Sequence, residues 1–107
     1  MEQQTSTLTK LQVLETIYQQ GYQNELVDLT LEKILDLERE QAHRDMNDLH
    51  RELSRFEAHY HLTSEDFYQR FQQGELGDDG DYFEWSACYD MYTTARERLH
   101  ALTGEPA

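Results

Sequence analysis

The amino-acid sequence predicts an all-α fold, an elongated helical bundle built on one long central helix with coiled-coil-like packing. Neither glycine nor proline interrupts residues 24–62. In the second half of that stretch, apolar residues recur in the 3-4 spacing of a coiled-coil seam. No segment alternates at every second residue as a β-strand does. A helix this long would extend on the order of 55 Å, so it must fold back on a partner helix, pair with another chain or break.

The first predicted element is a short helix at residues 8–20. Residues 1–7 are polar, and we expect them to form a flexible tail. From Leu8 to Tyr18, apolar residues recur at helical spacing. Gly21 lies where a left-handed residue would end this helix.

The long helix is expected to run over residues 24–62, with Asn24 as its N-cap. Its first half, from Leu26 to Leu37, is apolar around much of its circumference and needs burial from more than one side. We therefore expect the first helix to pack back on it as a hairpin. The second half narrows to a seam that we expect to mediate dimerisation wherever the last helix leaves it uncovered. The seam residues are Leu35, Ala42, Met46, Leu49, Leu53, Phe56 and Tyr60.

Three further elements complete a single predicted helical domain at residues 1–107. A short helix at residues 64–73 begins after a capping Thr63 or Ser64 and ends at Gly74. Residues 74–80 form an acidic glycine/aspartate turn. The C-terminal helix, at residues 81–103, carries an apolar stripe whose 3-4 spacing matches that of the seam.

Composition limits the kind of partner. The chain has 22 acidic and 9 basic side chains and a formal net charge of −13. Such a charge repels nucleic acids and anionic membranes and attracts basic proteins. The apolar runs are too short for a membrane span, and the N-terminus has no signal-peptide pattern. We therefore expect a cytoplasmic protein that binds no nucleic acid directly and enters no membrane.

Acidic and aromatic side chains alternate between Glu65 and Asp90, where Arg70 is the only basic residue. Aromatic anchors surrounded by acids suit a basic protein partner. The alternative, favoured for most of the rings, is that the rings form the core and the acids are only solvated. The candidate partner-binding residues are Phe67, Tyr68, Phe71, Asp78, Asp79, Asp81, Phe83, Glu84 and Trp85.

Metal and catalytic sites are not favoured. The acidic turn lacks the ligand spacing of a calcium-binding EF-hand loop. Two Glu-x-x-His motifs, at residues 40–43 and 97–100, resemble di-iron ligands, but they fall outside the apolar stripes that would form a bundle core. Cys88 lies near Glu84 and Asp90, an acidic setting that disfavours a reactive thiolate. The sequence therefore predicts a non-enzymatic protein without cofactor or metal.

The C-terminal motifs also resemble a known family. They are Ser64-Glu65-Asp66-Phe67-Tyr68, Phe71, Gly74-Glu75-Leu76-Gly77-Asp78-Asp79 and Glu84-Trp85. With these motifs, residues 60–92 resemble the TumA-type antitoxins, small prokaryotic proteins of toxin–antitoxin pairs, although Gly80 and Cys88 depart from the pattern. The resemblance implies a non-enzymatic protein that binds and neutralises a basic, RNA-acting toxin. Two alternatives remain open: a coiled-coil dimerisation or scaffold module without a toxin and, more distantly, a di-metal helical protein.

Overall fold

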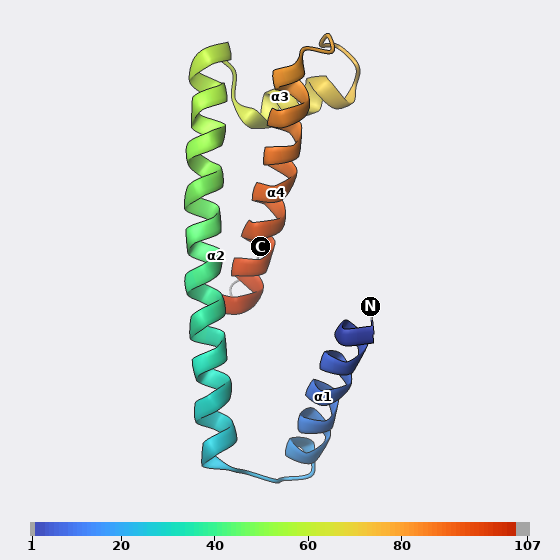
Figure 1. Ribbon diagram of the computed structural model, residues 1–107, viewed down its shortest axis with the longest axis vertical. Coiled ribbons are helices and arrows are strands. Elements are labelled where there is room, and N and C mark those ends of the chain that lie inside the picture. The colour runs from blue at the N-terminus through green and yellow to red at the C-terminus, as the bar shows by residue number, and fades with distance from the viewer. Residues whose placement is uncertain (1, 105–107) are drawn as a thin grey trace. The chain divides into compact units, whose positions relative to one another are not determined.

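The computed structural model describes residues 2–104, with side chains from residue 6 onward, and it confirms the all-α fold. Four helices and no strand occur in this described part of the chain (Figure 1). The helices are α1 (Glu2–Gln19), α2 (Glu25–Tyr60), α3 (Ser64–Gln72) and α4 (Gly80–Thr103). The long helix α2 is unbroken.

The chain divides into two compact units, residues 1–33 and 34–107, whereas the sequence suggested a single domain. Helix α1 begins at Glu2 and not after a tail of residues 1–7. The helix extends this far because residues 2–7 contain no glycine or proline that would stop it. Met1 and residues 105–107 lie outside the described residues.

Local capping fixes several helix ends where the sequence predicts them. The side-chain oxygen of Asn24 accepts a hydrogen bond from the backbone N–H of Val27 (3.3 Å) at the start of α2. Thr63 caps α3 in the same way, accepting from the N–H of Asp66 (3.1 Å). Gly21 follows α1 with φ of 97°, a left-handed conformation that glycine adopts without a steric cost.

The first unit, residues 1–33, joins α1 to the beginning of α2. The Tyr18 hydroxyl donates to the side chain of Asp28 (2.8 Å) and lies 3.1 Å from the carbonyl oxygen of Asn24. These contacts support the predicted hairpin, but they cover only part of its apolar surface. Large apolar side chains of this unit that stay exposed are Leu8, Leu11, Val13, Tyr22, Leu26 and Leu29.

The second unit, residues 34–107, has its core where α2, α3 and α4 meet (Figure 1). Trp85 of α4 and Phe67 of α3 are both 0% exposed, and their rings stack with centroids 3.8 Å apart. Trp85 also stacks on Phe56 of α2, at 5.6 Å. Its indole N–H donates to the Ser64 hydroxyl (2.9 Å), and the Ser64 backbone N–H donates to the carboxylate of Glu57 (2.8 Å).

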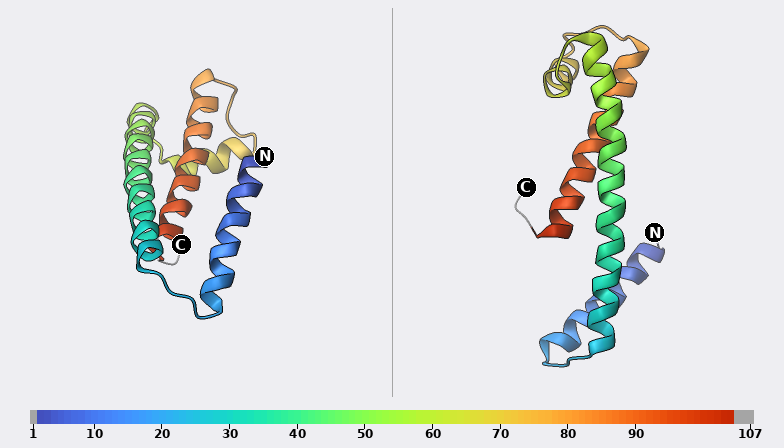
Figure 2. Two further views of the ribbon diagram at one scale, coloured as in Figure 1. Left: turned by 60° about the horizontal axis from the view of Figure 1, so that its bottom comes forward. Right: turned by 90° about the vertical axis from the view of Figure 1, so that its left-hand side faces the viewer.

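Helix α4 runs antiparallel to α2 within this unit (Figure 2). The Tyr60 hydroxyl donates to Asp81 (2.8 Å) at one end of the pair. At the other end, Nε of Arg39 donates to the carbonyl oxygen of Leu102 (3.0 Å). Leu102 lies at the C-terminal end of α4, where the negative end of the helix dipole also stabilises a cation.

This pairing covers much of the predicted dimerisation seam within one chain. Ala42 and Leu53 are buried, and Leu49, Phe56 and Tyr60 pack against the core. Met46 is half-buried, and only Leu35 remains exposed. Most of the seam is therefore wholly or partly covered inside the second unit, because the matching stripe of α4 meets it within the same chain.

Replacing Trp85 by alanine should destabilise the second unit by about 3–5 kcal/mol, since it leaves a large cavity and removes the Ser64 hydrogen bond. Phe83→Ala, an aromatic truncation two residues earlier on the exposed face of the same helix, should change stability by less than about 0.5 kcal/mol. Urea unfolding followed by circular dichroism measures both variants. Equal destabilisation by the two substitutions would contradict this packing.

Candidate partner-binding surface

The candidate surface is built by the end of α3, the loop 73–79 and the start of α4. Gly74 has φ of 74°, so the chain leaves α3 through a left-handed residue. The backbone N–H of Glu75 donates to the carbonyl oxygen of Arg70 (3.0 Å) and closes the end of the helix. At the other side of the loop, Asp79 caps α4 by accepting from the N–H of Asp81 (2.9 Å).

Two of the predicted partner-binding aromatic residues are core residues. Phe67 and Trp85 have no exposed surface, so neither can touch a partner while the unit is folded. This corrects their predicted role. The physical reason is the low apolar content of the chain, 37%, which leaves the large rings to fill the interior.

Two further predicted residues hold the helices together. The Tyr68 hydroxyl donates to the carboxylate of Asp90 (2.6 Å), which joins α3 to α4. Half-buried Asp81 accepts the hydrogen bond from Tyr60. Both residues therefore position the surface, and their polar atoms are already bonded within the chain.

The remaining predicted residues lie at the end of α3, in the loop and at the start of α4, and we call them together the acidic-aromatic surface: Phe71, Asp78, Asp79, Phe83 and Glu84. The Phe83 side chain is 59% exposed. Its ring meets the half-buried ring of Phe71 edge-on, with centroids 5.5 Å apart. The three carboxylates are exposed.

No cation neutralises these three carboxylates among the described residues. The ion pairs formed there lie along α2, where Arg39, Arg51 and Arg55 pair with acids three positions earlier. The acidic-aromatic surface therefore combines an exposed ring with unpaired negative charge. That combination suits a partner with apolar and cationic groups.

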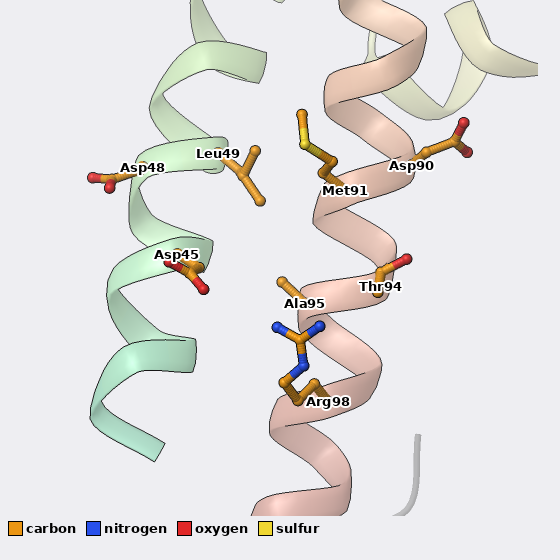
Figure 3. A pocket seen from close by; sticks show the side chains of 8 residues that line it. All are labelled: Asp45, Asp48, Leu49, Asp90, Met91, Thr94, Ala95 and Arg98. Carbon is orange, nitrogen blue, oxygen red and sulfur yellow. The ribbon is translucent and has the colours of Figure 1, made fainter. Parts of the chain in front are cut away.

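A groove that the sequence did not predict lies between α2 and α4 (Figure 3). We call it the α2–α4 groove, and its volume is about 490 Å³. Its lining residues are Asp45, Asp48, Leu49, Asp90, Met91, Thr94, Ala95 and Arg98. The available signal was Met91, Ala95 and Arg98 at positions i, i+4 and i+7, which place them on one helix face beside the apolar stripe of α4.

The structure gives no support for the metal or thiol alternatives. Within residues 6–104, no group of three or more histidine, cysteine, aspartate or glutamate side chains is arranged to hold a metal ion. The Cys88 thiol is buried, and burial raises its pKa, helped by the negative charges of Glu52 and Glu84. A raised pKa keeps the thiol protonated and weakly nucleophilic.

Comparison with known proteins adds no assignment, since no family model, curated protein or solved structure matches the chain. Within residues 2–104, none of the helices has the length and apolar character needed to cross a membrane.

The Tyr60–Asp81 hydrogen bond gives a pH test of this end of the unit. Donation to Asp81, then burial and the nearby charge of Asp79, raise the pKa of Tyr60 from 10.0 to about 12. A raised pKa means that folding favours the protonated hydroxyl, so its stabilisation is complete below pH 10 and is lost as the pH rises towards 12.

Wild-type protein should therefore lose more stability between pH 9 and pH 12 than Tyr60→Phe, which has no hydroxyl to ionise. Urea midpoints measured across this range provide the comparison. Tyr18 and Tyr68, whose pKa values are also raised, titrate in both proteins, so the difference isolates Tyr60. Parallel pH profiles would show that the Tyr60–Asp81 contact does not stabilise the fold.

Proposed function

We propose that this chain is an acidic, antitoxin-like protein that binds and neutralises a basic toxin in the cytoplasm by protein–protein contact. The observation that supports this most is the exposure of Phe83, 59%, near carboxylates that form no ion pair with any described residue. The resemblance of residues 60–92 to TumA-type antitoxins points to the same class of protein.

The two parts of the surface would contribute differently. Phe83, resting on Phe71, supplies an apolar anchor of the kind that dominates interface energies. The charges act at longer range, since residues 34–107 hold 17 acidic and 7 basic side chains. They would steer a basic protein toward the surface and cover the cationic groups with which it contacts RNA.

The test uses the product of the neighbouring gene, produced together with this chain; under the proposal it is a basic toxin. Wild-type chain should restore growth to cells that express this protein and should form a complex with it. Phe83→Ala should weaken the complex at least about tenfold, as the loss of an interface anchor does. Tyr22→Ala, which truncates an exposed aromatic ring of the first unit, serves as the control and should leave affinity unchanged. Calorimetry or surface plasmon resonance gives the affinities.

Ionic strength supplies an independent readout for the same complex. If carboxylates steer the encounter, the association rate should fall as salt rises and should fall further in the Asp78→Asn/Asp79→Asn variant. Asparagine at position 79 preserves the helix cap. An association rate that ignores both salt and these substitutions would remove the electrostatic part of the proposal.

A second candidate function, a dimerisation or scaffold module, is favoured by a different observation. The first unit leaves Leu8, Leu11, Val13, Leu26 and Leu29 exposed, and its charge is modest, with five acidic and two basic side chains. Exposed apolar surface of this kind marks an interaction site. Weak charge lets two copies approach each other, unlike the strongly acidic second unit.

Under this second candidate, sedimentation equilibrium should give a dimer mass, and Leu26→Asp or Leu29→Asp should convert it to a monomer, because a charge would be buried at the interface. Phe83→Asp, which adds the same charge in the second unit, should leave the dimer intact. A monomer mass for the wild-type chain at high concentration would exclude self-association through the first unit.

A further inference from the structure

We propose that the α2–α4 groove binds an amphipathic helix with a basic flank, supplied by the partner protein. This inference rests on the proposed function, because it takes that partner to be basic. It adds a second contact site, separate from the acidic-aromatic surface, and names the kind of segment that fills it.

The groove is where the helical packing of the second unit lacks a third helix. Helix α3, of 9 residues, crosses α4 near the beginning of that 24-residue helix and does not run along it, so α3 covers only the first part of α4 (Figure 1 and Figure 2). The contact of Tyr68 with Asp90 marks how far α3 reaches along α4. Beyond Asp90, the described residues of this unit place no third helix over the α2–α4 pair.

The floor of the groove is apolar and adaptable. Leu49 of α2 and Ala95 of α4 face the space between the two helices, and Met91 lies at its edge (Figure 3). Met91 is 54% exposed, although a thioether gains by burial. Its flexible side chain fits grooves that receive helices of varied sequence.

The length of the groove matches a short helical ligand. Asp90 and Arg98, which both line it, are separated by eight residues along α4, or about 12 Å at 1.5 Å per residue. Two turns of a helix span that length and present apolar side chains at positions i, i+3 or i+4, and i+7.

Charge selects a basic occupant over a second copy of this chain. Asp45, Asp48 and Asp90 line the groove, against the single cation Arg98. Asp48 pairs with Arg51, whereas Asp45 and Asp90 are hydrogen-bonded to Gln41 and Tyr68, neither of which is a cation. A second copy would bring a further net charge of −13 to this acidic region.

The test uses the full chain and three synthetic peptides of about five helical turns. One is an amphipathic leucine–lysine helix, one is its leucine–glutamate counterpart, and one has the leucine–lysine composition in a scrambled order. Fluorescence anisotropy should show binding of the amphipathic basic peptide alone. Met91→Gln should weaken that binding about tenfold, since it removes a buried apolar contact at similar size. Phe83→Ala should leave it unchanged.

A matched pair of charge reversals locates the peptide. Arg98→Glu and Arg96→Glu change the net charge of the same helix equally, but only Arg98 lines the groove. Arg98→Glu should tighten binding of the basic peptide about threefold to tenfold. Arg96→Glu should change the logarithm of the peptide dissociation constant by less than about half as much, because salt screens charges that lie outside the groove.

Equal effects of the two reversals, or binding of the acidic or scrambled peptide as tightly as the amphipathic basic one, would overturn the groove proposal. So would the absence of peptide binding. None of these results depends on the partner complex, which is tested separately by comparing Phe83→Ala with Tyr22→Ala. Conversely, the wild-type chain could form no complex with the expected partner while the basic peptide still binds specifically in the groove. That result would reject the proposed toxin partner and keep the groove as a site for basic helices.

Discussion

Trp85, a residue of α4, joins that helix to both α2 and α3. Its ring stacks on Phe67 of α3 and Phe56 of α2, and its indole N–H donates to the hydroxyl of Ser64 at the start of α3. Ser64 in turn donates its backbone N–H to Glu57 of α2. The indole thus fills the interior and has its polar group satisfied, which a buried N–H requires. Without this ring, the short helix α3 would lose its main apolar contact.

The exposed surface follows from the same burial. Successive residues of a helix lie about 100° apart, so Phe83 projects about 200° away from Trp85. Burying one ring therefore directs the other outward, next to Glu84 and the acidic loop. The rotation of α4 about its axis therefore determines both the packing of the core and the position of Phe83, the proposed anchor. The contacts of Tyr60 with Asp81 and of Arg39 with Leu102 hold the two ends of α4 in this orientation.

Local features of the fold were predictable from the sequence, and features that depend on distant packing were not. Asn24, Thr63 and Gly21 act within one helical turn of themselves, so their roles as caps and stops could be read directly. The seam from Ala42 to Tyr60 was recognised, but its 3-4 spacing is the same whether the partner is another chain or α4.

The candidate site shows the same division. The spacing of Phe83 and Trp85 predicts opposite faces, and the apolar stripe of the C-terminal helix, which includes Trp85, favours burial of the Trp85 face. The stripe does not say whether that face is buried within the chain or against a partner, and the prediction of Trp85 as a partner contact is wrong. The α2–α4 groove could not be predicted because it depends on where α3 crosses α4, which is set only once the helices are assembled.

Acrylamide quenching of the intrinsic fluorescence tests the central claim most directly, because Trp85 is the only tryptophan. Acrylamide is uncharged, so the acidity of the protein does not repel it as it would repel iodide. We expect blue-shifted emission with little quenching in the free chain, unchanged when the partner is bound. Strong quenching in the free chain that is relieved by the partner would contradict it, since Trp85 would then be an exposed contact residue and not the centre of the fold.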